Sequence, residues 1–519
     1  MYTLNGDAIY YAVLLWRALL MLARGELIQL SFERCGIAME RYKHIIPNYD
    51  EFLRVIDEPM PTNVRVNTIR ITPEQLIERL LRKGFEVERM GWCPYLLSLD
   101  GELSAGSTVE HWLGLYYIQE ATSLIAPMVL SPKPHEVVLD MCAAPGGKTT
   151  HIAMLMQNSG TVVANDPNPR RLRALMSNIF RLSVANCIVT QHDGIRMSAD
   201  GFKFDKAIVD VPCSAEGNLR KTPSRRYNIS TKYSLRISGL QKALLLKAID
   251  LVKVGGIIVY STCTFAPEEN EMVVQHALQT RDVRIEPIEI DVPSSNGLTE
   301  WEGIPFHKDM QYALRIYPHH FNSGGGFVAL LRKLGERSDG GRDVACIRNQ
   351  KKAHVKMKPA HKGDVEALLG YLFERFGIPD EAFHGLNFFE SSESIWVTSA
   401  DLDIANAIGN VISVGIRLAH IIDGRFKPTS YALMWLQPYI TSSIVQVEVQ
   451  ELTQLLLGQP VKARFDCARG YVAIAFEGDI IGCGFYTGEE LLCEMPKGRR
   501  AELLDALYCE RKLRAKSQE

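Results

Sequence analysis

The feature that most constrains the fold is an alternation of short apolar runs with helical runs between residues 136 and 334. The runs EVVLDMC, TVVANDP, CIVTQHD, FDKAIVDVP and GIIVYSTC have the length and β-branched content of buried strands. Between them stand runs with helical periodicity, such as KTTHIAMLMQ and SGLQKALLLKAIDL, the latter with Ser238 as its expected N-cap. Strands that alternate with helices predict an α/β fold with a parallel, doubly wound sheet.

The rest of the chain divides around this sheet. TNVRVNTIRI and PEQLIERLLRKG predict a strand and a helix of a small α/β unit, and GLYYIQEATSLIAPMVL is expected to be a helix that leads out of it. GERSDGGRD is typical of a linker, and the last part is rich in strands. We therefore expect six segments: an N-terminal extension (1–38), a small α/β domain (39–130), the doubly wound domain (131–335), a basic linker (336–363), an intermediate segment (364–430) and a β-rich domain (431–519).

Composition excludes several classes. A net charge of −2 gives no overall basic character, so any surface for nucleic acid must be local. The 11 cysteines include no C-x-x-C pair, which argues against a disulfide scaffold or a zinc site and favours the reducing cytoplasm. The apolar run at 8–22 is shorter than a membrane span and is interrupted by Arg17. We expect residues 1–38 to be an added helix or an upstream extension, with Met39 as a candidate true start.

A glycine loop follows the first strand of the repeat, in the sequence DMCAAPGGK. Glycines here let the backbone approach a ligand and turn tightly into a helix. The loop is neither G-x-G-x-x-G nor G-x-x-x-x-G-K-[ST], which disfavours dinucleotide and triphosphate sites. The candidate cofactor-binding residues of the loop are Cys142, Ala143, Ala144, Pro145, Gly146, Gly147 and Lys148.

Aspartates end three successive strands, at Asp166, Asp193 and Asp210. In open α/β sheets the ligand lies beyond the carboxyl ends of the strands. Asp166 stands 20 residues after Gly146, where a carboxylate can accept both ribose hydroxyls of an adenosine, and Asp193 can accept from the adenine amino group. An adenosine ligand without a triphosphate motif indicates S-adenosylmethionine as the cofactor.

Two cysteines, Cys213 and Cys263, follow the fourth and fifth strands. In the usual doubly wound order these strands are neighbours, so the two thiols are expected side by side. A thiolate that adds to carbon 6 of a pyrimidine activates carbon 5 for methyl transfer, and an acid near ring nitrogen 3 neutralises the developing charge. Asp210 could be that acid if its surroundings favour the protonated carboxyl. A DNA cytosine methyltransferase would explain Pro212-Cys213 but leaves Cys263 without a role.

The motifs MCAAPGGKTT, DVPCSAEG and STCTFAPEENE, together with TNVRVNTIR, YYIQEATS and GGFVALLRK, resemble the Nol/Nop/Sun family of RNA cytosine-5 methyltransferases over residues 60–334. The resemblance implies a Rossmann-like class I methyltransferase sheet. It also implies that Cys263 attacks carbon 6, that Cys213 assists product release, and that the loop 142–148 with Asp166, Asp193 and Asp210 binds the cofactor. Ala215 departs from the family, which usually has glycine there.

The segment 219–236 has six basic residues and no acid, and it directly follows Cys213. It is expected to grip RNA phosphates, with Tyr227 and Tyr233 stacking on bases. The candidate RNA-binding residues are Arg220, Lys221, Arg225, Arg226 and Lys232.

The final segment resembles a PUA-like RNA-binding domain. The whole arrangement resembles bacterial methyltransferases of small-subunit ribosomal RNA, which implies that the small α/β domain (39–130) is an RNA-binding domain. We expect a monomer that acts on 16S-type ribosomal RNA. Two alternatives stay open: a transfer-RNA methyltransferase and a noncatalytic RNA-binding or assembly factor.

Overall fold

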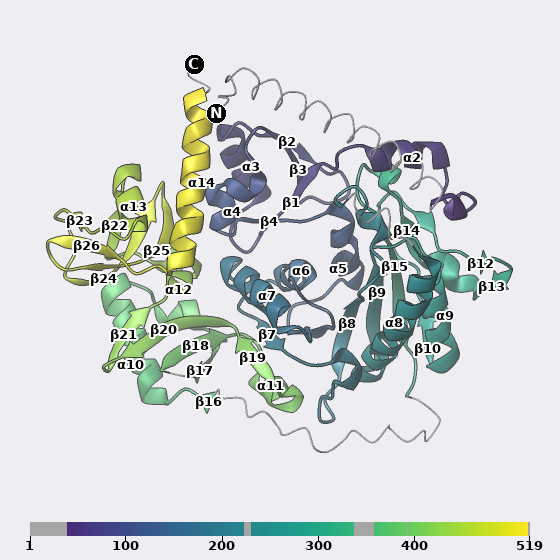
Figure 1. Ribbon diagram of the computed structural model, residues 1–519. Coiled ribbons are helices and arrows are strands. Elements are labelled where there is room, and N and C mark those ends of the chain that lie inside the picture. Colours follow the sequence, from purple (N-terminus) through teal and green to yellow (C-terminus); the bar gives the residue numbers. More distant parts are fainter. Residues whose placement is uncertain (1–38, 223–229, 337–357, 392, 517–519) are drawn as a thin grey trace, which may run out of the picture.

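The computed structural model describes residues 39–222, 230–336, 358–391 and 393–516 (Figure 1). At its centre is a mixed sheet of the order β11-β14-β15-β9-β8-β5-β6-β7-β19, with β10 beside β15. Its middle five strands are parallel, as the alternation of strands and helices predicts. They are β5 (Val137–Asp140), β6 (Thr161–Asn165), β7 (Cys187–Thr190), β8 (Phe204–Asp210) and β9 (Val252–Thr262).

The strand order reverses at β5, because the chain runs from β5 to β6 and β7 on one side and then returns to β8 on the other. The carboxyl ends of β5 and β8 therefore flank the switch point where ligands bind in open sheets. Four strands at one edge complete this part of the sheet: β10 (Val283–Ile285), β11 (Ser295–Asn296), β14 (Leu314–Ile316) and β15 (Gly326–Lys333).

Helices cover both faces of this sheet, so successive residues of a strand enter different cores. Val138 packs in the core under α5 (Ile125–Leu130), α6 (Gly147–Leu155) and α7 (Pro169–Arg181). Leu139 packs on the opposite face, under α8 (Thr231–Leu251) and α9 (Glu271–Thr280). Burial on both faces explains why the strands read as nearly continuous apolar runs. The doubly wound fold predicted from the sequence is confirmed.

The N-terminal domain is an antiparallel sheet of the order β2-β3-β1-β4. The run 114–130, expected to be one helix, is instead β4, a 3-10 turn (Ala121–Leu124) and α5. Its first part is extended because Tyr117 pairs with Arg65 of β1, and tyrosine and isoleucine suit such a pairing. The elements are α2 (Tyr49–Asp57), β1 (Thr62–Val66), α3 (Pro73–Arg82), β2 (Glu86–Arg89), β3 (Leu96–Asp100), α4 (Val109–Trp112) and β4 (Tyr116–Ile118).

The C-terminal half contains two five-stranded sheets. The first has β16 (Lys358–Pro359), β17 (Asn387–Glu390), β18 (Ser394–Thr398), β20 (Ile416–Ile422) and β21 (Arg425–Pro428), with α10 (Lys362–Phe376) and α11 (Leu402–Ile408). The second has β22 (Ile444–Gln446), β23 (Val461–Lys462), β24 (Gly470–Phe476), β25 (Asp479–Tyr486) and β26 (Glu490–Cys493), with α12 (Ser430–Trp435), α13 (Val449–Leu456) and α14 (Lys497–Lys516). β16 thus lies inside the expected linker 336–363, and the β-rich C-terminal region is consistent with a PUA-like domain.

Several contacts join the C-terminal half to the rest of the molecule, and two of them involve whole elements. β19 (Val411–Val414) pairs antiparallel with β7, so the intermediate segment adds a strand to the central sheet. At the other end, α14 lies between the N-terminal domain and the last sheet (Figure 1), where Glu510 accepts a 2.6 Å hydrogen bond from Lys83. The N-terminal and C-terminal domains share one hydrophobic core along this helix.

Within the described ranges, no helix has both the length and the apolar character that crossing a membrane requires.

Candidate active site

The two cysteines meet at the rim of the sheet because β8 and β9 are adjacent and parallel, with Asp210 opposite Ser261. The sulfur atoms of Cys213 and Cys263 lie 3.1 Å apart. The backbone N–H of Cys263 also donates to the sulfur of Cys213, at 3.4 Å. The structure thus brings together the pair that the strand order predicted.

The surroundings of the two thiols differ. The hydrogen bond with Cys263, burial and the charge of Glu269 raise the pKa of Cys213 well above its ordinary value, so this thiol keeps its proton. The sulfur of Cys263 receives a hydrogen bond from the Asn218 amide at 3.3 Å. Because a donated hydrogen bond stabilises negative charge on sulfur, Cys263 is the better placed of the two to act as a thiolate.

Asn218 is held by the tight turn after Cys213. Ala215 has φ 60°, a left-handed conformation that glycine adopts more readily, so the departure from the family's glycine costs some strain. The N–H of Gly217 donates to the carbonyl of Cys263 at 2.9 Å, and a Cβ there would lie 2.1 Å from the Gly325 carbonyl oxygen. The second glycine of the motif is therefore required by close backbone packing.

An ion pair stands beside the cysteines. The ammonium of Lys148 lies 2.7 Å from the Asp210 carboxylate, which also accepts from the Ser261 hydroxyl at 2.8 Å. Burial opposes the charge of Lys148, but the charges of Asp210 and Cys263 outweigh it and raise the pKa of the lysine. The proton is thus on Lys148, so the lysine is a second group here that can stabilise negative charge, and the predicted role of Asp210 as the acid stays a prediction.

The glycine loop is held from both sides. Gly146 has φ 107°, and a Cβ there would lie 2.8 Å from the Leu175 side chain, so only glycine fits this turn. The buried guanidinium of Arg65 donates to the Gly147 carbonyl at 2.7 Å and to the Thr150 hydroxyl at 2.8 Å. The small N-terminal domain therefore supports the cofactor loop directly.

A cavity of about 290 Å³ lies against this loop. The predicted residues that line it are Cys142, Ala143, Ala144, Pro145, Gly147, Lys148, Asp210, Lys221 and Cys263. Gln119, Asn218 and Ser261 also line it and were missed as site residues. Gln119 stands in the quoted motif YYIQEATS, and Asn218 directly follows DVPCSAEG, so both lie beside sequence signals that could have located them.

Asp166 and Asp193 do not line this cavity. Asp166 is fully buried and forms an ion pair with Arg171 at 3.0 Å, next to the loop carbonyl of Ala144 to which Arg171 also donates. The Asp193 side chain is 54% exposed and caps the following 3-10 turn by accepting from the Ile195 N–H. Their contacts with an adenosine stay predictions.

Buried carboxyl groups hold the loops that carry Cys213 and Cys263. Glu216 accepts from the hydroxyls of Tyr42 at 3.0 Å and Thr264 at 2.9 Å, and burial raises its pKa to about 7. Glu269 accepts the N–H of Ser214 at 3.0 Å. These contacts fix the residues directly after Cys213 and Cys263. Glu216 and Glu269 stand in the quoted motifs DVPCSAEG and STCTFAPEENE, but the sequence did not indicate their partners.

The basic segment 219–236 divides into different environments. Arg220 is buried, and its guanidinium donates to the carbonyls of Glu58, Pro59 and Ser323, so the prediction that it binds RNA is wrong. Arg225, Arg226 and Tyr227 lie outside the described residues. Lys232 and Tyr233 are exposed in the first turn of α8, which is capped by Ser230 and not, as predicted, by Ser238.

A parallel sheet of this order, with antiparallel β15 at its edge and a glycine loop after its first strand, defines the Rossmann-like methyltransferase class. A model described as 16S rRNA methyltransferase RsmB/F matches residues 127–332. A model of the N-terminal domain of 16S rRNA methyltransferase RsmF matches residues 38–121. The chain is 30% identical over 460 residues to ribosomal RNA small subunit methyltransferase F of Shewanella piezotolerans, covering 86% of this chain and 93% of the relative. The chain belongs to the RsmB/F family of methyltransferases.

Further similarities cover a little more than half of the chain. Human 28S rRNA (cytosine(4447)-C(5))-methyltransferase is 39% identical over 290 residues, 55% of this chain and 36% of that protein, so the chain spans about a third of this relative's length. A Pyrococcus abyssi tRNA (cytosine(49)-C(5))-methyltransferase is 37% identical over 301 residues, 57% of this chain and 95% of the relative. A Pyrococcus horikoshii structure titled as a methyltransferase homolog superposes with a TM-score of 0.53 at 36% identity, covering 59% of this chain and 98% of that one.

Proposed function

We propose that the protein is an S-adenosylmethionine-dependent RNA (cytosine-5)-methyltransferase that forms a covalent adduct with its target base. The observation that carries this proposal is the pair of thiols 3.1 Å apart, beside the Lys148–Asp210 ion pair at one cavity. A single reactive thiol would serve many reactions. Two thiols and an ammonium at one rim supply one group for each step. One thiol attacks the base, the ammonium stabilises the charge that develops, and the second thiol removes the proton.

The cavity residues fit a cationic cofactor. Asp140 lines the cavity, and among the described residues its Oδ1 atom is buried without a hydrogen-bond partner. Burial raises the pKa of Asp140 to about 7, and a bound cation would favour its ionised form. S-adenosylmethionine carries an ammonium and a sulfonium, and when bound it supplies the methyl group. A Pyrococcus horikoshii relative, titled NSun6 with SFG, is 26% identical with a TM-score of 0.50 and supports this choice.

In the proposed mechanism, the Cys263 thiolate adds to carbon 6 of the cytosine, and the electron pair of the 5,6 double bond moves toward carbon 5 and ring nitrogen 3. The Lys148 ammonium, held by Asp210, stabilises the charge at that nitrogen. Carbon 5 would then form its bond to the methyl group as the bond between that methyl group and the cofactor's sulfur breaks. Bonding of Cys263 to carbon 6 removes the hydrogen bond and the charge that keep Cys213 protonated, so Cys213 can release its proton to solvent. The Cys213 thiolate then takes the proton from carbon 5, and the bond between carbon 6 and Cys263 breaks.

For the substrate, we propose small-subunit ribosomal RNA, because the relatives that match most of the chain are named small subunit methyltransferases. Transfer RNA is the second candidate, since the Pyrococcus abyssi relative is named for it. We propose that the β-rich region 431–519 and the segment around Lys221 and Lys232 bind this RNA, and that the protein acts as a cytoplasmic monomer.

Incubation with RNA that contains 5-fluorocytosine tests the chemistry, because fluorine at carbon 5 blocks the release step and traps the adduct. We expect a denaturation-resistant protein–RNA complex mapping to Cys263 by mass spectrometry. A stable adduct at Cys213, formed preferentially with DNA, would instead indicate a DNA methyltransferase. Failure to form any adduct with ribosomal or transfer RNA, while RNA still binds, would favour the noncatalytic factor.

A further inference from the structure

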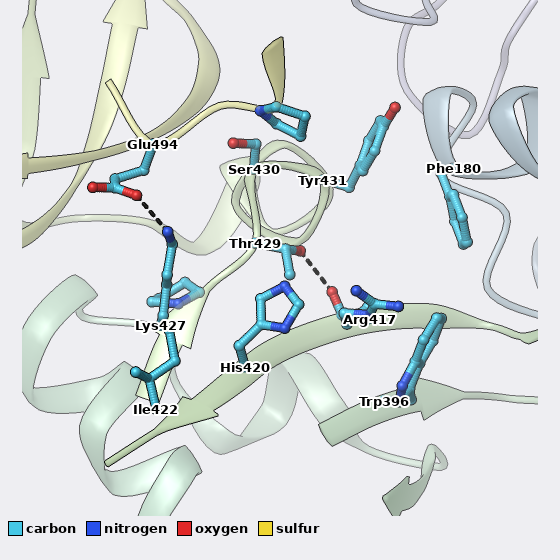
Figure 2. A pocket seen from close by; sticks show the side chains of 12 residues that line it. Phe180, Trp396, Arg417, His420, Ile422, Lys427, Thr429, Ser430, Tyr431 and Glu494 are labelled. Carbon is cyan, nitrogen blue, oxygen red and sulfur yellow. Dashed lines mark hydrogen bonds and ion pairs between the residues drawn. The ribbon is translucent and has the colours of Figure 1, made fainter. Parts of the chain in front are cut away.

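A second cavity, of about 470 Å³, lies away from the cysteines (Figure 2). It is formed where the last turn of α7, the sheet β18-β20-β21 and the start of α12 meet. Figure 2 shows Phe180, Trp396 and Tyr431 on one side with Arg417 beside Trp396, and His420 and Lys427 on the other side. The residues that matter below are Phe180, Trp396, Arg417, His420, Lys427 and Tyr431.

The aromatic side is built from three elements. The ring of Phe180 lies 6.3 Å from that of Trp396 and 5.7 Å from that of Tyr431, centroid to centroid. Trp396 is itself stacked on Phe389 at 6.2 Å, which fixes the plane of the indole. Fixed aromatic rings at a cavity provide surfaces on which a flat, unsaturated ring can stack.

Within the part of the chain that the structure describes, one cation of the lining, Arg417, has no carboxylate partner. The guanidinium of Arg417 lies 4.6 Å from the centre of the Trp396 ring, and its buried Nε has no hydrogen-bond partner among the described residues. Lys427, by contrast, is paired with Glu494. The pKa of His420 is lowered by burial and by the charges of Arg417 and Lys427, so this ring is neutral and adds hydrogen-bonding capacity only. The cavity therefore attracts one anionic group, at Arg417.

We propose that this cavity binds one unpaired nucleotide of the RNA substrate, with its base against the aromatic rings and its phosphate on Arg417. The inference rests on the proposed RNA substrate and adds a second contact to it. A nucleotide within a strand carries one phosphate and one flat base, which matches one free guanidinium beside an aromatic wall. A free di- or triphosphate needs several unpaired cations or a glycine-rich loop around its phosphates, and the described lining has neither.

The position of the cavity suits this role. Phe180 belongs to α7, the helix that also packs on the cofactor loop, where the Asn178 amide donates to the Pro145 carbonyl at 3.0 Å. The same helix begins just after Asp166. One rigid helix thus connects the nucleotide cavity with the catalytic rim, so an RNA bound at both places is held in a defined register.

The test compares Arg417→Gln with Arg425→Gln in the full-length protein. Arg425 is an exposed arginine on the neighbouring strand β21 and does not line the cavity, so its replacement removes the same charge as a matched control. Affinity is measured by fluorescence anisotropy with a mixed-sequence single-stranded RNA 12-mer and with the same RNA in a duplex. We expect Arg417→Gln to weaken single-strand binding about tenfold, and Arg425→Gln to change it less than twofold.

A second measurement addresses the base. Cross-linking with 4-thiouridine in the 12-mer is expected to label peptides that contain Phe180, Trp396 or Tyr431, and Phe180→Leu should reduce the yield severalfold. Thermal unfolding of each variant checks its folding. Equal single-strand affinity of folded Arg417→Gln and Arg425→Gln, without cross-links to these peptides, overturns the inference even if the wild type methylates RNA. Specific labelling without methylation would instead retain the cavity and refute the proposed activity.

Discussion

The sulfur atoms of Cys213 and Cys263 lie 3.1 Å apart, although 50 residues separate them in the chain. Adjacent parallel strands bring them together, and each sulfur has its own hydrogen-bonding environment. The hydrogen bond from Asn218 reaches Cys263 only, while burial and the contact with Cys263 keep Cys213 protonated. This asymmetry leads to opposite expectations for the two cysteine variants.

Replacing Cys263 by Ala should reduce methylation by more than about a thousandfold, because it removes the attacking atom. Replacing Cys213 by Ala should leave attack intact but slow release, so a covalent complex with ordinary RNA should accumulate. Denaturing gel electrophoresis after incubation with S-adenosylmethionine measures both. Cys467→Ser, distant in the C-terminal domain, should behave as the wild type. A covalent complex in Cys263→Ala would contradict the assignment.

Replacing Lys148 by Met should lower kcat about a hundredfold or more, because the charge at ring nitrogen 3 loses its ammonium partner. Asp210→Asn keeps a polar group beside the lysine, so it should lower kcat by a smaller factor. Steady-state kinetics with RNA and with S-adenosylmethionine as the varied substrate separate kcat from KM. A variant with unchanged kcat and a raised KM for the cofactor alone would place Lys148 in cofactor binding only.

Stability should fall as pH rises through neutrality. The pKa of Glu216 is raised in the folded protein from 4.5 to about 7, so the folded state binds a proton there more tightly than the unfolded chain. The contribution of Glu216 to the free energy of unfolding is fully present below pH 4.5 and is lost as pH rises through about 7. Its size is on the order of 3 kcal/mol. Asp140, with its pKa raised to about 7, acts in the same direction.

Urea-unfolding midpoints between pH 5 and 8 test this expectation. Glu216→Gln should flatten the pH dependence without abolishing it, since Asp140 remains, while the exposed Glu40→Gln should leave the wild-type slope. Identical slopes in the wild type and Glu216→Gln would show that Glu216 titrates normally.

Removing Arg315 should destabilise the fold strongly. Its guanidinium forms a buried, two-pronged ion pair with Glu271, at 2.5 and 2.7 Å, and donates to the Phe265 carbonyl behind Cys263. Arg315→Met leaves a buried carboxylate unpaired, at a cost of about 3–5 kcal/mol in unfolding free energy. The double variant Arg315→Met/Glu271→Leu should recover most of the lost unfolding free energy. As a surface comparison, Arg82→Met, which breaks the exposed pair with Glu78, should cost less than about 1 kcal/mol.

The doubly wound sheet could be predicted because its strands are buried on both faces, which leaves a local signature in the sequence. The positions of Cys213 and Cys263 followed from strand order alone. In contrast, Tyr116–Ile118 is a strand only because it pairs with β1, about 50 residues earlier, and local periodicity does not record such a partner.

Charge patterns predicted the site residues less well than the strand pattern predicted the fold. Arg220 was expected on the RNA surface, but carbonyl oxygens from two distant segments, near Pro59 and Ser323, satisfy its guanidinium in the interior. Glu216 lies in the motif DVPCSAEG and Asn218 directly follows it, but their partners, Tyr42 and Cys263, are remote in the sequence, so their contacts could not be predicted from it. The structure places Lys148 beside Asp210, and the role of Asp210 as the acid stays a prediction.

The C-terminal half is attached to the molecule at separate places, among them β19 in the central sheet and α14 against the N-terminal domain. A part fixed at more than one point cannot swing as a tethered arm does. The spacing between the cavity at Arg417 and the thiol of Cys263 is therefore set by the fold and works as a ruler. With the proposed RNA contact at Arg417, such a ruler would select RNA by the separation of two features in its folded shape, so a short sequence around the cytosine would not by itself define a target.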